Sequence, residues 1–111
     1  MTAVSDETIQ RMVEAIVAEV QPERVYLFGS RARGEARESS DVDLLVVESE
    51  PFGEGRSHLR ETNRIYRALS GFLVPVDVLL FSAAEFEKWR DSLNNVVGRC
   101  VREGRLLYAR S

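Results

Sequence analysis

Val25-Tyr-Leu-Phe-Gly-Ser-Arg-Ala-Arg-Gly-Glu-Ala-Arg-Glu-Ser-Ser-Asp-Val-Asp-Leu-Leu-Val-Val47 is the stretch that decides the fold of this chain. An apolar segment runs into Gly29-Ser30, and after residues 31–40 a second apolar segment begins at Asp41-Val-Asp43. Short apolar runs rich in β-branched residues are typical of buried strands. Successive side chains of a strand point to opposite faces, so the two aspartates project from the same face.

Two carboxylates on one face of a strand repel each other and lose solvation, which folding alone does not favour. A divalent cation such as Mg²⁺ would reverse this cost, because hard cations take oxygen ligands. The Gly29-Ser30 turn offers a phosphate group a close backbone approach, a hydroxyl donor and, where a helix follows, free N–H groups. Metal-binding carboxylates beside a phosphate-binding turn indicate a site that handles nucleotides.

This arrangement resembles the signature of the polymerase β-like nucleotidyltransferase superfamily, which places a Gly-Ser turn before an Asp-x-Asp strand. In so short a chain it most resembles the minimal nucleotidyltransferases, the antitoxin half of bacterial and archaeal HEPN–MNT toxin–antitoxin pairs. The resemblance is close over residues 24–47 and extends to the rest of the chain in layout. It implies an α/β (α+β) fold with a small mixed β-sheet flanked by helices.

The resemblance implies that Asp41, Asp43 and Asp77 are the catalytic carboxylates and the ligands of two Mg²⁺ ions. In a two-metal site the ions lie ~3.5–4 Å apart and clamp the attacking and leaving oxygens. Asp77 is also expected to help deprotonate the hydroxyl nucleophile. Two simpler interpretations stay open, in which Asp41 caps a turn and Asp77 forms a salt bridge to an arginine, because an unpaired aspartate inside an apolar run is costly.

The same resemblance implies that Gly29 and Ser30 hold the β- and γ-phosphates of ATP or another nucleoside triphosphate. Ser30 would also serve as the N-cap of a short helix, which is compatible with phosphate binding. Arg31 and Arg33 are candidate contacts to the triphosphate or to a partner, and a solvated helix face explains them almost equally well.

The predicted reaction transfers a nucleoside monophosphate, AMP in the first instance, from the triphosphate to a hydroxyl group with release of pyrophosphate. A minimal chain has no room for a domain that binds the acceptor, so another macromolecule is expected to present it. The resemblance implies a tyrosine of a HEPN ribonuclease toxin, which makes this chain an antitoxin. The alternatives are a non-catalytic binding antitoxin with a vestigial site and a nucleotidyltransferase acting on a small molecule.

Composition and charge narrow the class of protein further. With 111 residues and no linker, residues 1–111 are predicted to form one domain. The formal charge of −3 argues against non-specific binding to nucleic acid. A single cysteine excludes an internal disulfide and fits a reducing, cytoplasmic location. Neither a signal peptide nor an apolar run long enough to span a membrane is expected.

Periodicity and end signals predict the remaining elements. The strand over 41–48 is apolar on both faces, so it should be central, with Leu45 and Val47 covered by the C-terminal helices or by a partner. In the helix over 57–70, the side chains expected to be buried are Leu59, Ile65, Tyr66 and Leu69. Helices are predicted over 6–20, 30–36, 57–70, from 83 onward and over 93–103, and strands over 24–28, 41–48, 74–81 and 105–109.

Overall fold

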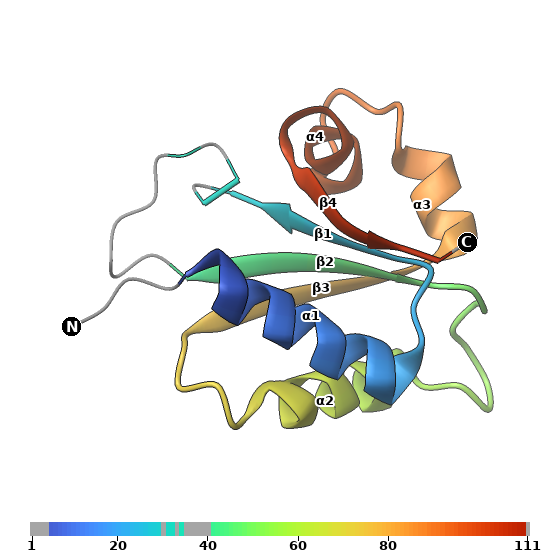
Figure 1. The fold of residues 1–111 in the computed structure, drawn as a ribbon. Helices are drawn as coiled ribbons and strands as arrows, with labels where there is room; N and C mark the ends of the chain where they lie inside the picture. Colours follow the sequence, from blue (N-terminus) through green and yellow to red (C-terminus); the bar gives the residue numbers. More distant parts are fainter. Residues whose placement is uncertain (1–4, 30, 33, 35–40, 111) are drawn as a thin grey trace.

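The computed structural model describes residues 5–29, 31–32, 34 and 41–110. In this part of the chain four helices surround a four-stranded sheet (Figure 1). No helix within these residues is long and apolar enough to cross a membrane. The elements are α1 (Asp6–Val20), β1 (Arg24–Phe28), β2 (Val42–Glu48), α2 (His58–Leu69), β3 (Val76–Ser82), α3 (Ala83–Trp89), α4 (Val96–Glu103) and β4 (Arg105–Ala109).

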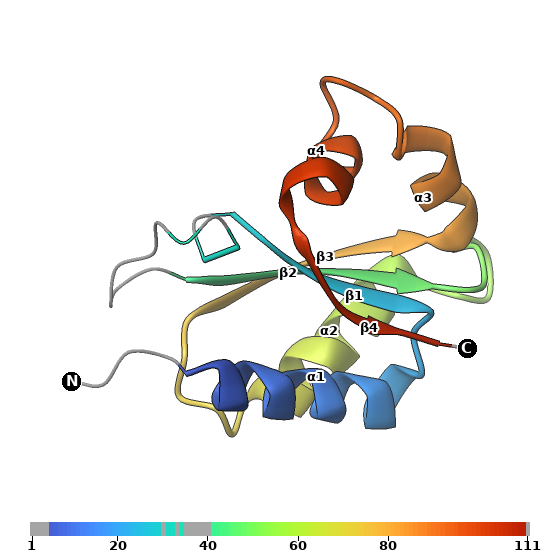
Figure 2. The ribbon, with the colours of Figure 1, turned by 45° about the horizontal axis from the view of Figure 1, so that its top comes forward.

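The sheet has the strand order β3-β2-β1-β4. Strand β1 runs antiparallel to both of its neighbours, whereas β2 and β3 run parallel and are joined by helix α2. Helices α1 and α2 cover one face of the sheet, and α3 and α4 cover the other (Figures 1 and 2). The predicted class, a small mixed sheet flanked by helices, is therefore confirmed.

Strand β2 is central and buried on both faces, as its sequence predicts. Val42, Leu44 and Val46 face the core formed with α1 and α2. Leu45 and Val47 face a second core, whose other members include Phe86, Val97 and Cys100 from α3 and α4. The C-terminal helices thus cover Leu45 and Val47, and no partner is needed for their burial.

Short polar signals fix where the helices begin. The Ser5 side chain accepts a hydrogen bond from the Thr8 backbone and caps α1. Ser82 and Glu85 form the predicted capping box at the start of α3. Helix α4 begins at Val96 rather than at residue 93, because the Asn95 side chain accepts a hydrogen bond from the Val97 backbone and ends the preceding loop.

The expectation for helix α2 was partly wrong. Ile65 and Leu69 are buried, but Leu59 is 69% exposed and Tyr66 is 37% exposed. The Tyr66 hydroxyl accepts a hydrogen bond from the Val78 backbone at 2.9 Å, and His58 Nε2 lies 2.8 Å from the Leu80 carbonyl oxygen. These side chains cover the outer edge of β3, which is the edge strand beyond β2.

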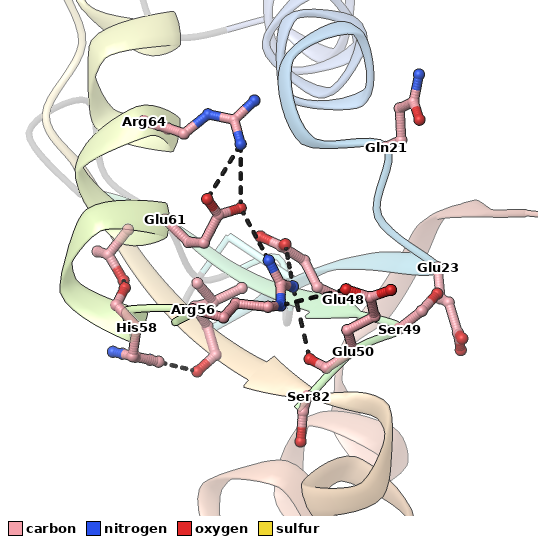
Figure 3. A network of polar contacts seen from close by, with 12 residues as sticks. Gln21, Glu23, Glu48, Ser49, Glu50, Arg56, His58, Glu61, Arg64 and Ser82 are labelled. Carbon is pink, nitrogen blue, oxygen red and sulfur yellow. Dashed lines mark hydrogen bonds and ion pairs between the residues drawn. The ribbon is translucent and has the colours of Figure 1, made fainter. Parts of the chain in front are cut away.

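A polar network links helix α2 to strand β2, and the buried Glu61 belongs to it (Figure 3). Arg56 contacts the buried Glu48 carboxylate at 2.7 Å and Glu61 at 3.4 Å, and Arg64 contacts Glu61 at 3.0 Å. Burial raises the pKa of Glu48 against the effect of the Arg56 hydrogen bond. Moving the loop after β2 or helix α2 away from the sheet would break these pairs and leave a buried charge uncompensated, which is costly. The network therefore holds the loop and the helix against the sheet.

Helix α4 packs closely against the loop that precedes it. A Cβ added at Gly98 would lie 2.0 Å from the Ser92 carbonyl oxygen, so the loop backbone occupies the space of a side chain. Arg102 also donates to the Ser92 carbonyl at 2.8 Å. Together these contacts fix the position of α4 over the sheet.

The predicted helix over 30–36 falls mostly outside the described residues. Arg31, Ala32 and Gly34 are in a turn, in which the Gly34 backbone N lies 3.4 Å from the Arg31 carbonyl oxygen.

Candidate functional site

The three predicted carboxylates lie at the same end of the sheet, where strands β2 and β3 begin. Strands β2 and β3 are parallel, so both begin at this end of the sheet. Asp43 pairs in register with Asp77. Asp41 directly precedes β2, where the Val42 backbone donates to the Pro75 carbonyl at 2.9 Å. Neighbouring strands lie about 4.8 Å apart, and residues in register share a face. Asp43 and Asp77 are therefore adjacent.

The Gly29 turn meets the Asp43 carboxylate from the other side. Strand β1 runs antiparallel to β2, and its last residue, Phe28, pairs with Asp43. Gly29 has a φ of 75°, a conformation that favours glycine. A Cβ at this position would lie 2.4 Å from Asp43 Oδ2 and 3.3 Å from its Cγ. The absence of a side chain on Gly29 is what lets the carboxylate lie against the turn.

The charges at this end of the sheet act on the carboxyl group of Asp43. Its pKa is raised above the usual value, first by burial and then by the negative charges of Asp77 and Asp41, while Arg31 acts in the opposite direction. Asp41 and Asp77 are exposed, and Asp43 is half-buried. The site therefore places negative charges around a partly desolvated carboxylate. This arrangement favours the binding of a cation or a proton to that carboxylate.

These residues fit Mg²⁺ by the chemistry of their donors. Carboxylate oxygens are the ligands that hard cations prefer. Among the described residues, no three acidic, histidine or cysteine side chains are already gathered closely enough to hold an ion. Mg²⁺ usually binds through one or two carboxylates, several waters and the phosphates of a substrate. The arrangement fits an ion that is held partly by the substrate, not one enclosed by the protein.

The structure brings some of the predicted site residues together and does not describe others. Gly29, Asp43 and Asp77 lie together, Asp41 adjoins them, and Arg31 acts on the Asp43 carboxylate. Ser30 and Arg33 lie outside the described residues.

One physical argument for Asp77 was wrong. Its apolar neighbours suggested a buried carboxylate, but β3 is an edge strand and Asp77 is exposed, so its charge needs no compensating partner. No ion pair to Asp77 forms within the described part of the chain, so the structure does not show the proposed salt bridge to an arginine.

A cavity beside the turn had no signal in the sequence. It has a volume of about 170 Å³ and lies between the end of β1 and helix α4. A larger cavity of about 500 Å³, lined by Glu48, Arg56 and Glu61 among others, lies at the opposite end of β2. Glu48 is five residues further along the strand than Asp43, or roughly 16 Å away. Of these two cavities, the smaller one is next to the aspartates, because Gly29 lines it and lies against Asp43.

Comparison with known proteins identifies the family. The model of the family described as "Nucleotidyltransferase domain" matches residues 9–102. This chain belongs to that family. The nucleotidyltransferase match extends from α1 into α4 and so includes Gly29 and all three aspartates.

Two relatives from Methanocaldococcus jannaschii are provisionally named protein adenylyltransferases. One is 36% identical to this nucleotidyltransferase over 75 residues, which cover 68% of this chain and 76% of the relative. The other is 38% identical over 58 residues, covering 52% of this chain and 54% of the relative.

Solved structures with this nucleotidyltransferase's fold include a provisionally named nucleotidyltransferase from Sulfolobus solfataricus. Its TM-score is 0.61 at 24% identity, and the match covers 92% of this chain and 78% of that one. A toxin–antitoxin structure with AMP-PNP matches with a TM-score of 0.62 at 18% identity, covering 92% of this chain and 74% of that one. At these identities the likeness establishes the fold.

Replacing Gly29 by alanine should affect nucleotide binding more than the stability of the fold. The left-handed backbone conformation costs an alanine roughly 1 kcal/mol of stability. The added Cβ must also displace the Asp43 carboxylate, whose Oδ2 lies within 2.4 Å of that position. We expect a small loss in urea-unfolding free energy and a loss of Mg²⁺-dependent nucleotide binding of tenfold or more, estimated as about one charge-assisted contact.

The matched control is Gly53→Ala, since a Cβ at Gly53 meets nothing within 4 Å and no positive φ is involved. Nucleotide binding by Gly29→Ala at the wild-type affinity would show that the turn and the Asp43 carboxylate do not form one site.

Proposed function

We propose that residues 1–111 act as one domain, a Mg²⁺-dependent adenylyltransferase that moves AMP from ATP to a hydroxyl group of a partner protein. The proposed acceptor is a tyrosine of a HEPN ribonuclease toxin, whose modification inactivates it, so that this chain acts as a cytoplasmic antitoxin. The close approach of Gly29 to the Asp43 carboxylate carries the proposal, because it brings the proposed phosphate-binding turn next to a proposed metal ligand. The names of the curated relatives support a protein as the acceptor.

The chain's own groups suit an in-line displacement. The acceptor hydroxyl oxygen forms a bond to the α-phosphorus, and the bond from that phosphorus to the bridging oxygen of pyrophosphate breaks. The hydroxyl proton passes to the Asp77 carboxylate, which is exposed and therefore accessible to an acceptor on another molecule. Mg²⁺ held by Asp41, Asp43 and Asp77, as two ions in the full site, would neutralise the charge on the phosphates and the leaving group.

The triphosphate is proposed to lie along the turn after β1. Gly29 permits a close backbone approach, while Ser30, Arg31 and Arg33 are the proposed phosphate contacts. The positive charge of Arg31 acts on the Asp43 carboxylate, which supports a role for Arg31 near the proposed metal ligands.

The acceptor protein needs a surface beside Asp77. Leu45 and Val47 cannot provide it, because α3 and α4 bury both. Leu79, on the same face of β3 as Asp77, is 37% exposed, and Leu73, in the loop before β3, is 97% exposed. Exposed apolar side chains next to a catalytic carboxylate are suited to docking a protein that presents a hydroxyl. Structural neighbours that are toxin–antitoxin complexes are consistent with a toxin protein in this role.

The catalytic assignment is tested with Asp43→Asn, which keeps the side-chain volume and removes the charge. We expect Mg²⁺-dependent transfer of label from α-labelled ATP to the HEPN protein to fall by a factor of at least ~10³, since positioned charges contribute several kcal/mol to such reactions. Circular dichroism should stay native. Asp91→Asn, an exposed aspartate in the loop after α3, is the matched control. Transfer by Asp43→Asn at the wild-type rate would rule out the metal-ligand role.

The docking surface is tested with Leu73→Glu. Because Leu73 is 97% exposed, the substitution should leave the fold intact while it places a charge where an apolar contact is proposed. We expect the Kd for the proposed HEPN partner to rise about tenfold, a typical loss at an interface hot spot. Isothermal titration calorimetry provides the measurement.

Leu106→Glu, at a position that is 52% exposed on β4, is the control and should leave binding unchanged. Equal effects of the two substitutions would place the partner elsewhere on the molecule.

A further inference from the structure

The cavity between β1 and α4 shares a wall with the carboxylate site. Gly29 lines the cavity and also contacts the Asp43 carboxylate. Helix α4 covers the face of the sheet toward which Asp43 points, because Leu45, two residues further along β2, packs with Val97 and Cys100. A molecule bound at the Gly29 turn can therefore extend into this cavity without leaving that face.

The size and inner walls of the cavity suit a planar aromatic group. Its volume is about 170 Å³, and an engineered apolar cavity of about 150 Å³ in another protein binds benzene. The walls include Phe28 at the end of β1 and Val96 and Cys100 on α4. An aromatic wall provides a surface on which any nucleobase can stack, because every base has a π-face.

The mouth of the cavity carries two charged side chains with different hydrogen-bonding abilities. Arg99 and Glu103 both line it, both are exposed, and they lie four residues apart on the same side of α4. Within the described residues no ion pair of 4.0 Å or less includes either of them. A guanidinium can only donate hydrogen bonds, and a carboxylate can only accept them.

We propose that this cavity receives the base of the nucleoside triphosphate, that Arg99 favours purines and that Glu103 selects adenine over guanine. The inference rests on the proposed function, which places the triphosphate at the Gly29 turn. Every purine carries the N7 acceptor that Arg99 can contact. Adenine presents an amino donor at position 6, whereas guanine presents a carbonyl acceptor there, which the Glu103 carboxylate repels. Glu103 is thus a specificity-determining residue.

The test measures binding to the full chain by isothermal titration calorimetry in Mg²⁺. The probes are AMP-PNP, GMP-PNP and inorganic tripolyphosphate, which has no base. Glu103→Gln should lower the preference for AMP-PNP over GMP-PNP by about tenfold, the factor expected for one charge-assisted hydrogen bond, because an amide can both donate and accept. Arg99→Ala should weaken both nucleotides about tenfold. Tripolyphosphate binding should not change in either variant.

The control is Glu87→Gln on α3, which removes an exposed carboxylate away from the cavity and should leave all three affinities unchanged. An unaltered base preference in Glu103→Gln would overturn the role of Glu103. If Arg99→Ala weakened tripolyphosphate as much as AMP-PNP, Arg99 would be a phosphate contact and the cavity would not hold the base.

Failure of the proposed function gives a different pattern. Normal base discrimination together with no transfer to a protein would contradict the proposed reaction and support the base-binding cavity. Absence of binding for all three probes would contradict both.

Discussion

The contact between the Gly29 backbone and the Asp43 carboxylate is the constraint on which the site depends. It requires β1 and β2 to pair so that Phe28 lies opposite Asp43, and it requires a residue without a Cβ at position 29. The parallel pairing of β2 with β3 then places Asp77 beside Asp43. Three chain segments that are distant in sequence therefore meet through the register of one sheet, and a shift of one residue would turn every side chain to the opposite face.

Strand β2 stabilises this register because both of its faces are buried in hydrophobic cores and charged residues stand at both of its ends. One end carries the aspartates, and the other carries Glu48 in its network with Arg56 and Glu61. Two cores and a buried ion-pair network hold the strand in place, so a partly desolvated carboxylate can be kept at its start. The carboxylates at that end of the sheet repel one another, which is unfavourable for folding, and the proposed cation would offset this repulsion.

The apolar pattern of the chain was sufficient to predict its four strands, whereas the roles assigned to the site residues stay predictions. Asp43 was found because an aspartate next to Val42 and Leu44 conflicts with the apolar pattern of the strand. The exposure of Asp77 could not be predicted in this way, because it depends on β3 being an edge strand. Leu59 was misplaced because the buried residues of α2 are Glu61, Ile65 and Leu69, and Glu61 is buried through ion pairs with Arg56 and Arg64 that its sequence neighbours do not reveal. The cavity at Arg99 and Glu103 depends on how α4 packs against β1, which no local pattern encodes.

The stability of Asp43→Asn without metal tests most directly whether the aspartates are gathered for a ligand. Removing the half-buried charge should raise the free energy of urea unfolding in EDTA at neutral pH by about 1 kcal/mol, within the usual range for single substitutions. Mg²⁺ with AMP-PNP should then stabilise the wild-type protein clearly and the variant much less. A variant that is less stable than wild type in EDTA, and equally stabilised by Mg²⁺ and nucleotide, would show that Asp43 serves the fold and not the site.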